Sequence, residues 1–157
     1  MAQLSAGLMM YRITNHGPEY FLVHPGGPFY ASKDNGVWTV PKGLCNQDED
    51  LLDAAKREFA EETGLSPKGE FVPLGFIKMK SGKLVHAWMF EGEWNAESGI
   101  SSNTFLLEWP PKTGKILQVP EADKGGWFDF ETAIAKINSN QQPFLFRARD
   151  LLDNRDQ

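Results

Sequence analysis

The stretch Gly43–Leu65, GLCNQDEDLLDAAKREFAEETGL, carries most of the information in this chain. Its second half has apolar residues at helical spacing and predicts a helix from about Asp50 to Thr63. Glutamates stand at positions i, i+3 and i+4 of this helix, so their carboxylates fall within an arc of roughly 100°. These glutamates are Glu58, Glu61 and Glu62.

Three carboxylates at this spacing repel one another, because like charges on neighbouring helix positions destabilise a helix. Glu58 and Glu62 lie at the edge of the apolar stripe of the helix, beside Leu51 and Ala55, so we expect them to be half buried. Half-buried carboxylates need a partner, and a hard divalent cation satisfies several of them at once. The alternative for an isolated EFAEE segment is an ordinary solvated helix face.

The spacing in this stretch resembles the Nudix box, G-x5-E-x7-R-E-U-x-E-E-x-G-U, in which U is a bulky apolar residue. Every fixed position matches, and Phe59 and Leu65 fill the two U positions. If each of seven fixed residue types occurs at about 7%, a chance match has a probability on the order of 10⁻⁸ per start site. The resemblance implies an α+β fold, the Nudix αβα sandwich with a mixed β-sheet between helices. We expect one such domain over residues 1–157.

The same resemblance implies a Mg²⁺-dependent hydrolase that cleaves a phosphoanhydride bond, with Mn²⁺ as a substitute. Mg²⁺ would supply a nucleophilic water and spread negative charge over phosphoryl oxygens. Its implied ligands are Glu58, Glu61, Glu62 and the carbonyl group of Gly43. Arg57 is expected to orient these carboxylates through the fork geometry of its guanidinium group.

Two carboxylates are candidates for the base that takes a proton from the attacking water. Some Nudix enzymes use the carboxylate that matches Glu58, and others use a carboxylate on a distant loop. The loop candidate here is Glu121 in the segment VPEADKGGWF, with Asp123 second, and an ordinary surface acid is the alternative for both. Proton transfer requires hydrogen-bond reach, so the sequence leaves the choice open.

Lysines before the box and around a turn are candidates for binding substrate phosphates. Lys42 precedes the box in the segment PKG, and a lysine point charge suits a phosphate contact. Lys80 and Lys83 flank the turn-like pair Ser81-Gly82 between two expected strands. Solvated loop lysines, and lysines that protect an edge hairpin from aggregation, are the alternatives.

The rest of the chain reads as strands with two further helices. Apolar segments bounded by turn residues predict strands at 3–13, 19–24, 37–40, 71–80, 83–94, 104–109 and 126–130. Helical spacing predicts helices at 131–138 and 143–153. The segment 110–125 reads as irregular, since it is rich in Pro, Gly and Lys.

The composition fits one small enzyme domain. A chain of 157 residues, 41% of them hydrophobic, buries about two thirds of its unfolded surface. The single cysteine, Cys45, excludes an internal disulfide, and no apolar run has the length of a membrane span. We therefore expect a cytoplasmic protein with no membrane partner, as a monomer or homodimer. The net charge of −5 argues against stable binding of nucleic acid, but a small phosphorylated nucleotide remains compatible because bound metal reverses the local field.

The segment WTVPKG, which follows a short N-terminal strand pair, is similar to the diadenosine tetraphosphate hydrolases of the Nudix family. The expected substrate is therefore a dinucleoside polyphosphate or a nucleoside triphosphate. An RNA 5′ pyrophosphohydrolase is disfavoured by the acidic charge and by the lack of a basic patch interleaved with aromatic residues. A non-catalytic nucleotide sensor on the same fold is the alternative from another class, but its box should have lost carboxylates, and this box has kept them all.

Overall fold

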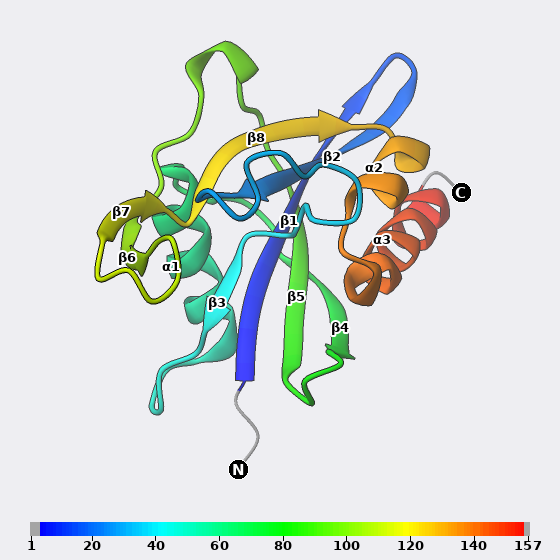
Figure 1. The fold of residues 1–157 in the computed structure, drawn as a ribbon. Coiled ribbons are helices and arrows are strands. Elements are labelled where there is room, and N and C mark those ends of the chain that lie inside the picture. The colour runs from blue at the N-terminus through cyan, green and yellow to red at the C-terminus, as the bar shows by residue number, and fades with distance from the viewer. Residues whose placement is uncertain (1–3, 156–157) are drawn as a thin grey trace.

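The computed structural model describes residues 4–155 and is built around a mixed β-sheet (Figure 1). The elements in chain order are β1 (Leu4–Thr14), β2 (Gly17–Pro25), β3 (Lys42–Leu44), α1 (Leu51–Thr63), β4 (Val72–Lys78), β5 (Leu84–Glu91), β6 (Thr104–Glu108), β7 (Ile116–Pro120), β8 (Ala122–Phe128), α2 (Phe130–Lys136) and α3 (Gln142–Arg155).

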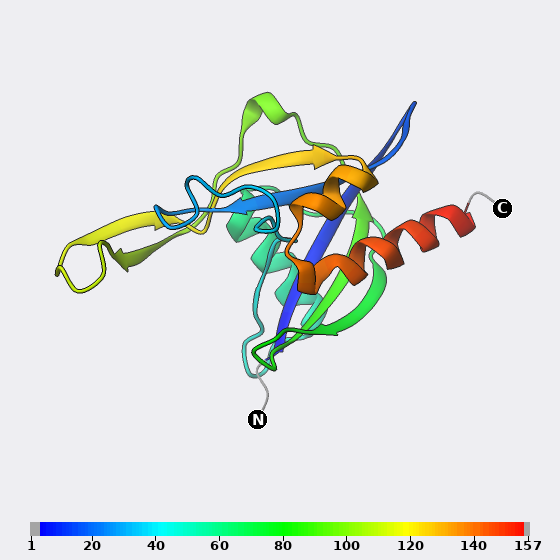
Figure 2. The same cartoon turned by 45° about the vertical axis from the view of Figure 1, so that its right-hand side comes forward.

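The main sheet has the strand order β4-β5-β1-β2-β8, and β3 pairs with one end of β1. β1 and β5 are parallel, while the other neighbours in this sheet are antiparallel. Strands β6 and β7 form a separate antiparallel pair. Figure 2 shows this pair as an arm that extends beyond the body of the domain.

Helices cover both faces of the main sheet (Figures 1 and 2). Side chains of β1 alternate between the two faces, as expected for a strand with period two. Leu8 and Met10 belong to the apolar cluster that includes α1, and Met9 and Tyr11 belong to the cluster that includes α2 and α3. The αβα sandwich and the α+β class predicted from the sequence are thus confirmed.

No helix within residues 4–155 combines the length and the apolar character that a membrane crossing requires.

Local signals at both ends explain the position of α1. Asp50 is the N-cap residue, and its side chain accepts hydrogen bonds from the backbone N–H groups of Leu52 and Asp53. Gly64 ends the helix in the left-handed conformation, with a φ of 78°. The helix predicted over residues 50–63 is correct to within one residue, because its caps and its 3.6-residue period are both visible in the sequence.

Three predictions of strands and turns were wrong. Residues 37–40 form only isolated bridges, and the strand that pairs with β1 begins at Lys42 instead. The segment 110–125, predicted to be irregular, contains β7 and the start of β8. The connection between β4 and β5 spans residues 79–83, and a hydrogen bond from Met79 N to Lys83 O (2.8 Å) encloses three residues, with Gly82 at a φ of 90°. The sequence predicts a two-residue turn there instead.

Candidate active site

Helix α1 presents two buried carboxylates to strand β3. Glu58 and Glu62 lie one turn apart on the helix, and each residue is only 9% exposed. The backbone N–H of Lys42 donates a hydrogen bond to Oε2 of Glu62 over 2.8 Å. The carboxylate pair therefore faces the strand that opens the Gly43–Leu65 stretch.

Gly43 makes room for the first of these carboxylates. A Cβ atom on Gly43 would lie 2.0 Å from both the carboxyl carbon and Oε2 of Glu58. No other residue type fits this position while Glu58 keeps its place. The pairing of Gly43 with Ala6 of β1 holds this part of the backbone against the sheet.

Arg57 organises the acidic side chains around it. Its Nε and Nη2 donate to the two carboxylate oxygens of Glu49, each over 2.9 Å, in a bidentate pair. Its Nη1 donates to Glu58 over 2.8 Å and to Glu61 over 3.2 Å, and Nη2 also donates to the carbonyl oxygen of Leu44 over 2.9 Å. One guanidinium group thus joins three carboxylates to the backbone of β3.

Burial changes the protonation of this cluster. Loss of solvation raises the pKa of Glu62 from 4.5 to about 8, although the hydrogen bond from Lys42 works in the opposite direction. Burial also raises the pKa of Glu58, and the charge of Glu121 raises both values further. The pKa of Lys42 is lowered by burial in the same region. Without a cation, ionisation of the buried carboxyl groups of Glu58 and Glu62 is therefore energetically unfavourable compared with that of solvated glutamates.

The donor set has the chemistry of a site for a hard cation. Carboxylate and carbonyl oxygens are the ligands that Mg²⁺ prefers, and a buried acid with a raised pKa gains from a cation beside it. Within residues 4–155, however, no three Asp, Glu, His or Cys side chains already stand at metal-ligand spacing. The reason is visible in the contacts: Glu58 and Glu61 turn to Arg57, and Glu62 turns to the amide of Lys42.

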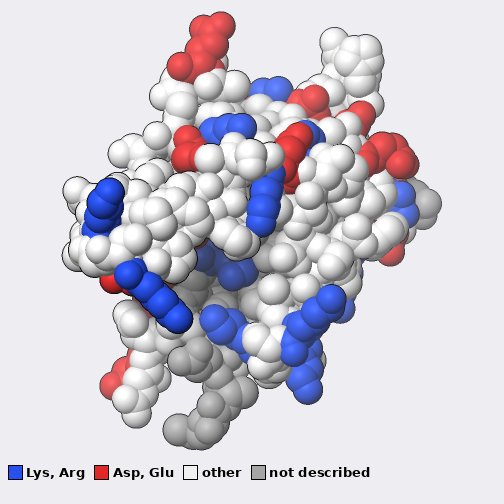
Figure 3. Space-filling model, viewed as in Figure 1, with Lys and Arg blue, Asp and Glu red and all other residues white. Residues whose placement is uncertain are grey.

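Positive charge lies beside the carboxylates. The charge of Lys83 helps to lower the pKa of Lys42, so both lysines contribute to the potential of the same region. Figure 3 shows Lys and Arg side chains around a hollow between the β6–β7 arm and the tip of the β4–β5 hairpin. Lys80 is exposed in that tip, and among the described residues no hydrogen bond or ion pair joins it to the cluster.

The loop carboxylates have different surroundings. Glu121 lies between β7 and β8, and its charge acts on Glu58, Glu62 and Lys42. Asp123 is instead bonded to His24, whose Nδ1 lies 2.8 Å from Oδ1 of the carboxylate. The sequence analysis did not single out His24. Its signal was a lone polar residue at the end of the buried run Tyr20–Val23.

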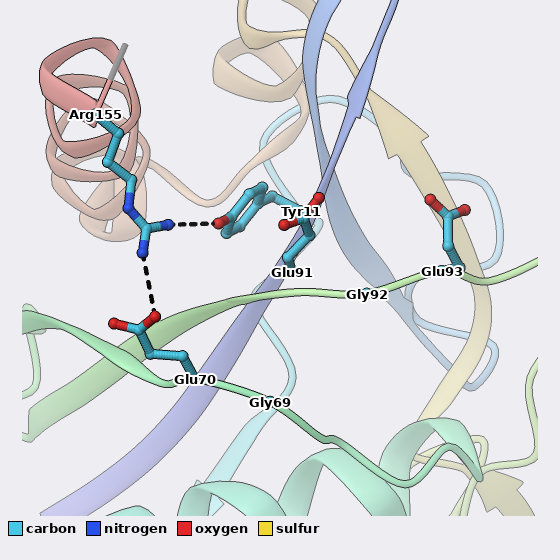
Figure 4. A pocket seen from close by; sticks show the side chains of 7 residues that line it. All are labelled: Tyr11, Gly69, Glu70, Glu91, Gly92, Glu93 and Arg155. Carbon is cyan, nitrogen blue, oxygen red and sulfur yellow. Dashed lines mark hydrogen bonds and ion pairs between the residues drawn. The ribbon is translucent and has the colours of Figure 1, made fainter. Parts of the chain in front are cut away.

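A second hollow lies at the other end of β1, away from Gly43. It has a volume of about 430 Å³ and is lined by Tyr11, Glu70, Glu91 and Arg155, among others (Figure 4). Arg155 donates to the hydroxyl oxygen of Tyr11 and pairs with Glu70 across the opening. The residues predicted for the active site are not part of its lining.

Comparisons with known proteins identify the family and the fold. Residues 3–148 match the NUDIX domain family. Over 72 residues the chain is 38% identical to "Phosphatase NudJ" of Escherichia coli strain K12, and this alignment covers 43% of the chain. It covers only 40% of NudJ, so the chain spans less than half the length of the curated relatives that it matches.

Two solved structures have a similar fold. An Ap4A hydrolase binary complex from C. elegans has a TM-score of 0.66 at 20% identity, covering 96% of this chain and 98% of that one. The NUDIX domain of Shewanella oneidensis NrtR complexed with ADP ribose has a TM-score of 0.65 at 15% identity, covering 97% and 89%. The match over residues 3–148 includes most of the chain and the whole carboxylate cluster, and the protein therefore belongs to the NUDIX domain family.

Proposed function

We propose that this protein is a Mg²⁺-dependent pyrophosphohydrolase that cleaves a phosphoanhydride bond in a nucleoside diphosphate linked to another moiety. The observation that carries the proposal is the pair of buried carboxylates, Glu58 and Glu62, with lysine charge beside them. Two acids in this setting are well suited to hold a divalent cation against a phosphate chain.

In the proposed site, Glu58, Glu61, Glu62 and the carbonyl group of Gly43 hold Mg²⁺, and Mn²⁺ substitutes for it. The ion, when bound, lowers the pKa of a coordinated water and disperses charge on the phosphoryl oxygens. Arg57 orients Glu58 and Glu61, to which its guanidinium group donates hydrogen bonds.

The remaining roles belong to side chains near this cluster. Glu58 is the first candidate for the base, since its raised pKa favours proton uptake nearer to neutral pH than for a solvated glutamate. Glu121 is the second candidate, because its charge acts on the same carboxylates. Lys42, Lys83 and the exposed Lys80 in the β4–β5 tip bind the phosphate chain.

The choice of substrate class is supported by the resemblance of the segment WTVPKG and by the names of similar proteins. The two similar structures are an Ap4A hydrolase and a NUDIX domain complexed with ADP ribose. Ap4A and ADP ribose are both adenosine phosphates joined to a second group. Under 25% identity, this likeness supports a shared fold and suggests which substrates to test first. A dinucleoside polyphosphate is our first choice, followed by a nucleoside triphosphate. An RNA 5′ end and a non-catalytic nucleotide sensor are the alternatives.

A turnover screen tests the proposal. Dinucleoside polyphosphates, nucleoside triphosphates, ADP ribose and 5′-triphosphorylated RNA are incubated with the protein and Mg²⁺, and released phosphate and pyrophosphate are measured. Glu62→Gln should reduce turnover by orders of magnitude without unfolding the domain, whereas Glu97→Gln, in an exposed turn, should leave it unchanged. Equal activity in the two variants, or no metal-dependent turnover of any substrate, contradicts the proposal.

A further inference from the structure

His24 is a buried histidine that the proposed reaction does not use. Its side chain is only 2% exposed, and its ring packs edge-on against Trp38 at a centroid distance of 5.3 Å. Nδ1 lies 2.8 Å from Oδ1 of Asp123, and Nε2 lies 2.7 Å from the carbonyl oxygen of Lys33. Both ring nitrogens are therefore engaged by oxygen atoms.

Both of these oxygen partners are acceptors. An ionised carboxylate has no proton to donate, and a backbone carbonyl never has one. Nε2 therefore donates to the carbonyl oxygen of Lys33, and Nδ1 is held within hydrogen-bond distance of the Asp123 carboxylate. These two contacts offset the cost of burying a polar ring, which by itself requires no functional role. The position of His24 in the fold suggests a further role.

Asp123 sits at an irregularity in the sheet. The register of β2 against β8 shifts next to His24, and Asp123 has no residue opposite it in the described pairing. Such β-bulges bend a strand and re-aim the side chains around them, often beside active sites. Glu121 lies two residues before Asp123, directly ahead of the first residue of β8.

The backbone of Glu121 is held from two sides. Its carbonyl oxygen accepts a hydrogen bond from Gly26 N over 3.1 Å, and its N–H donates to the carbonyl oxygen of Asn103 over 2.9 Å. Gly26 opens the loop that contains Lys33, to which His24 donates. One imidazole ring therefore contacts both segments that flank Glu121, namely the bulge of β8 and the loop that follows β2.

We propose that His24 and Asp123 form a positioning pair that fixes the direction in which Glu121 faces the carboxylates of α1. The inference rests on the proposed function, in which Glu121 acts close to the reacting phosphates. It also assigns Asp123, the second loop candidate for the base, to a supporting role, since its carboxylate is bonded to His24.

Two substitutions of Asp123 separate positioning from chemistry. Asp123→Asn keeps both contacts of a neutral ring, because the amide N–H donates to Nδ1 while Nε2–H donates to Lys33. Asp123→Ala leaves the ring without this partner. We expect Asp123→Ala to lower kcat about 10- to 100-fold, the usual cost of losing a group that orients a reacting site. Asp123→Asn should restore most of that loss. If both variants lose kcat equally, Asp123 itself reacts and the inference is wrong.

A double variant tests whether the pair acts through Glu121. Once Glu121→Gln has removed the positioned carboxylate, Asp123→Ala should have little further effect on kcat, because groups that act as a unit are not additive. Independent effects that multiply, or a Glu121→Gln enzyme with unchanged kcat, would overturn the inference. Asp129→Ala is the control: it removes the N-cap of α2 at the far end of β8 and should lower Tm without changing kcat.

Amide hydrogen exchange gives a readout that does not depend on turnover. Asp123→Ala should accelerate exchange at the N–H groups of Gly26 and Glu121, and Asp123→Asn should not, because exchange reports local opening of these hydrogen bonds. Unchanged exchange in Asp123→Ala overturns the positioning pair. An unaltered protein without metal-dependent turnover contradicts the proposed function instead, so the two failures are distinguishable.

Discussion

The carboxyl group of Glu58 lies against Gly43 so closely that a Cβ atom on the glycine would stand 2.0 Å from the carboxyl carbon. Gly43 is not among the glycines with positive φ, so its backbone conformation is open to any residue. A glycine is needed at position 43 because the carboxyl group of Glu58 leaves no room for a side chain, and not because the backbone turns there. The first position of the box is thus tied directly to the carboxylate that is our first candidate for the base.

Gly43→Ala should impair activity more than stability. The clash involves the flexible end of a glutamate side chain, so Glu58 can swing away while the backbone stays in place. We expect kcat to fall about 100-fold, since a displacement near 1 Å in a reacting group has this cost. Tm should change little.

Gly92→Ala is the matched control, because its Cβ would meet the flexible end of Met10, 2.7 Å away at the sulfur atom, outside the proposed site. It should leave kcat unchanged. A Gly43→Ala enzyme with normal kcat would mean that the position of Glu58 is not important for the reaction.

The raised pKa of Glu62 predicts how the stability of the metal-free protein depends on pH. The carboxyl group titrates at about 8 when folded and at its ordinary value near 4.5 when unfolded, so the folded state binds the proton more tightly. This contribution to stability is complete below the unfolded pKa and is lost as pH rises through about 8. Glu58, with its pKa also raised by burial, acts in the same direction.

Thermal melts in the presence of a chelator should therefore give a Tm that falls between pH 5 and pH 9, and Glu62→Gln should flatten this slope. Mg²⁺ should raise Tm more at pH 8.5 than at pH 6, because its binding requires the ionised carboxylates. At a concentration 100 times its Kd, the gain in stability is about 2.7 kcal/mol. If Tm depends on pH in the same way in the unaltered protein and in Glu62→Gln, both without and with Mg²⁺, Glu62 is not a metal ligand.

Arg57→Lys should weaken the site although it keeps the charge. Lysine replaces the planar fork with a single point charge, so the bidentate pair with Glu49 and the bond to Leu44 O cannot both survive. We expect Mg²⁺ affinity or kcat to fall about 10- to 100-fold, the usual cost of losing a group that orients metal ligands.

Arg147→Lys provides the comparison for this loss. Arg147 donates to the backbone carbonyl groups of Leu74 and Phe76, so it ties α3 to β4 outside the carboxylate cluster. The control should lower Tm and leave metal affinity intact. If Arg57→Lys and Arg147→Lys behave alike in a metal titration, Arg57 has only a structural role.

The sequence predicted α1 well because its signals are local. Asp50 and Gly64 cap the helix, and the carboxylates and apolar residues keep a 3.6-residue period between them. Strand β7 was missed because its pattern is not that of a buried strand. Ile116 and Leu117 are 58% and 40% exposed, and they are ordered by pairing with β6 instead of by core packing.

The parts of the site that the sequence did not predict depend on contacts between distant positions. The partner of Glu62 is a backbone N–H group 20 residues away, and no side-chain pattern signals it. The partner of His24 is 99 residues away in a strand that was predicted to start later. The spacing of the motif identified the acids that gather on α1. The different surroundings of the two loop acids depend on the folded sheet, which places Asp123 beside His24 and Glu121 near the carboxylates of α1.

The identity of the base can be decided by comparing two isosteric substitutions. Glu58→Gln and Glu121→Gln each remove one proton acceptor while preserving the shape of the side chain. The variant that lacks the base should show a large fall in kcat and lose the acidic limb of the pH profile, because that limb reports ionisation of the base. We expect this result for Glu58→Gln, whose carboxylate is buried and oriented by Arg57.

Glu121→Gln should instead cause a smaller fall in kcat and keep the acidic limb. Because Glu121 raises the pKa of Glu58, its neutralisation should move that limb to lower pH. A shift of the limb without its loss therefore identifies Glu121 as a neighbouring charge, and loss of the limb identifies it as the base. Near-normal kcat in Glu58→Gln at saturating Mg²⁺ would transfer the role to Glu121, and the bulge held by His24 would then position the base itself.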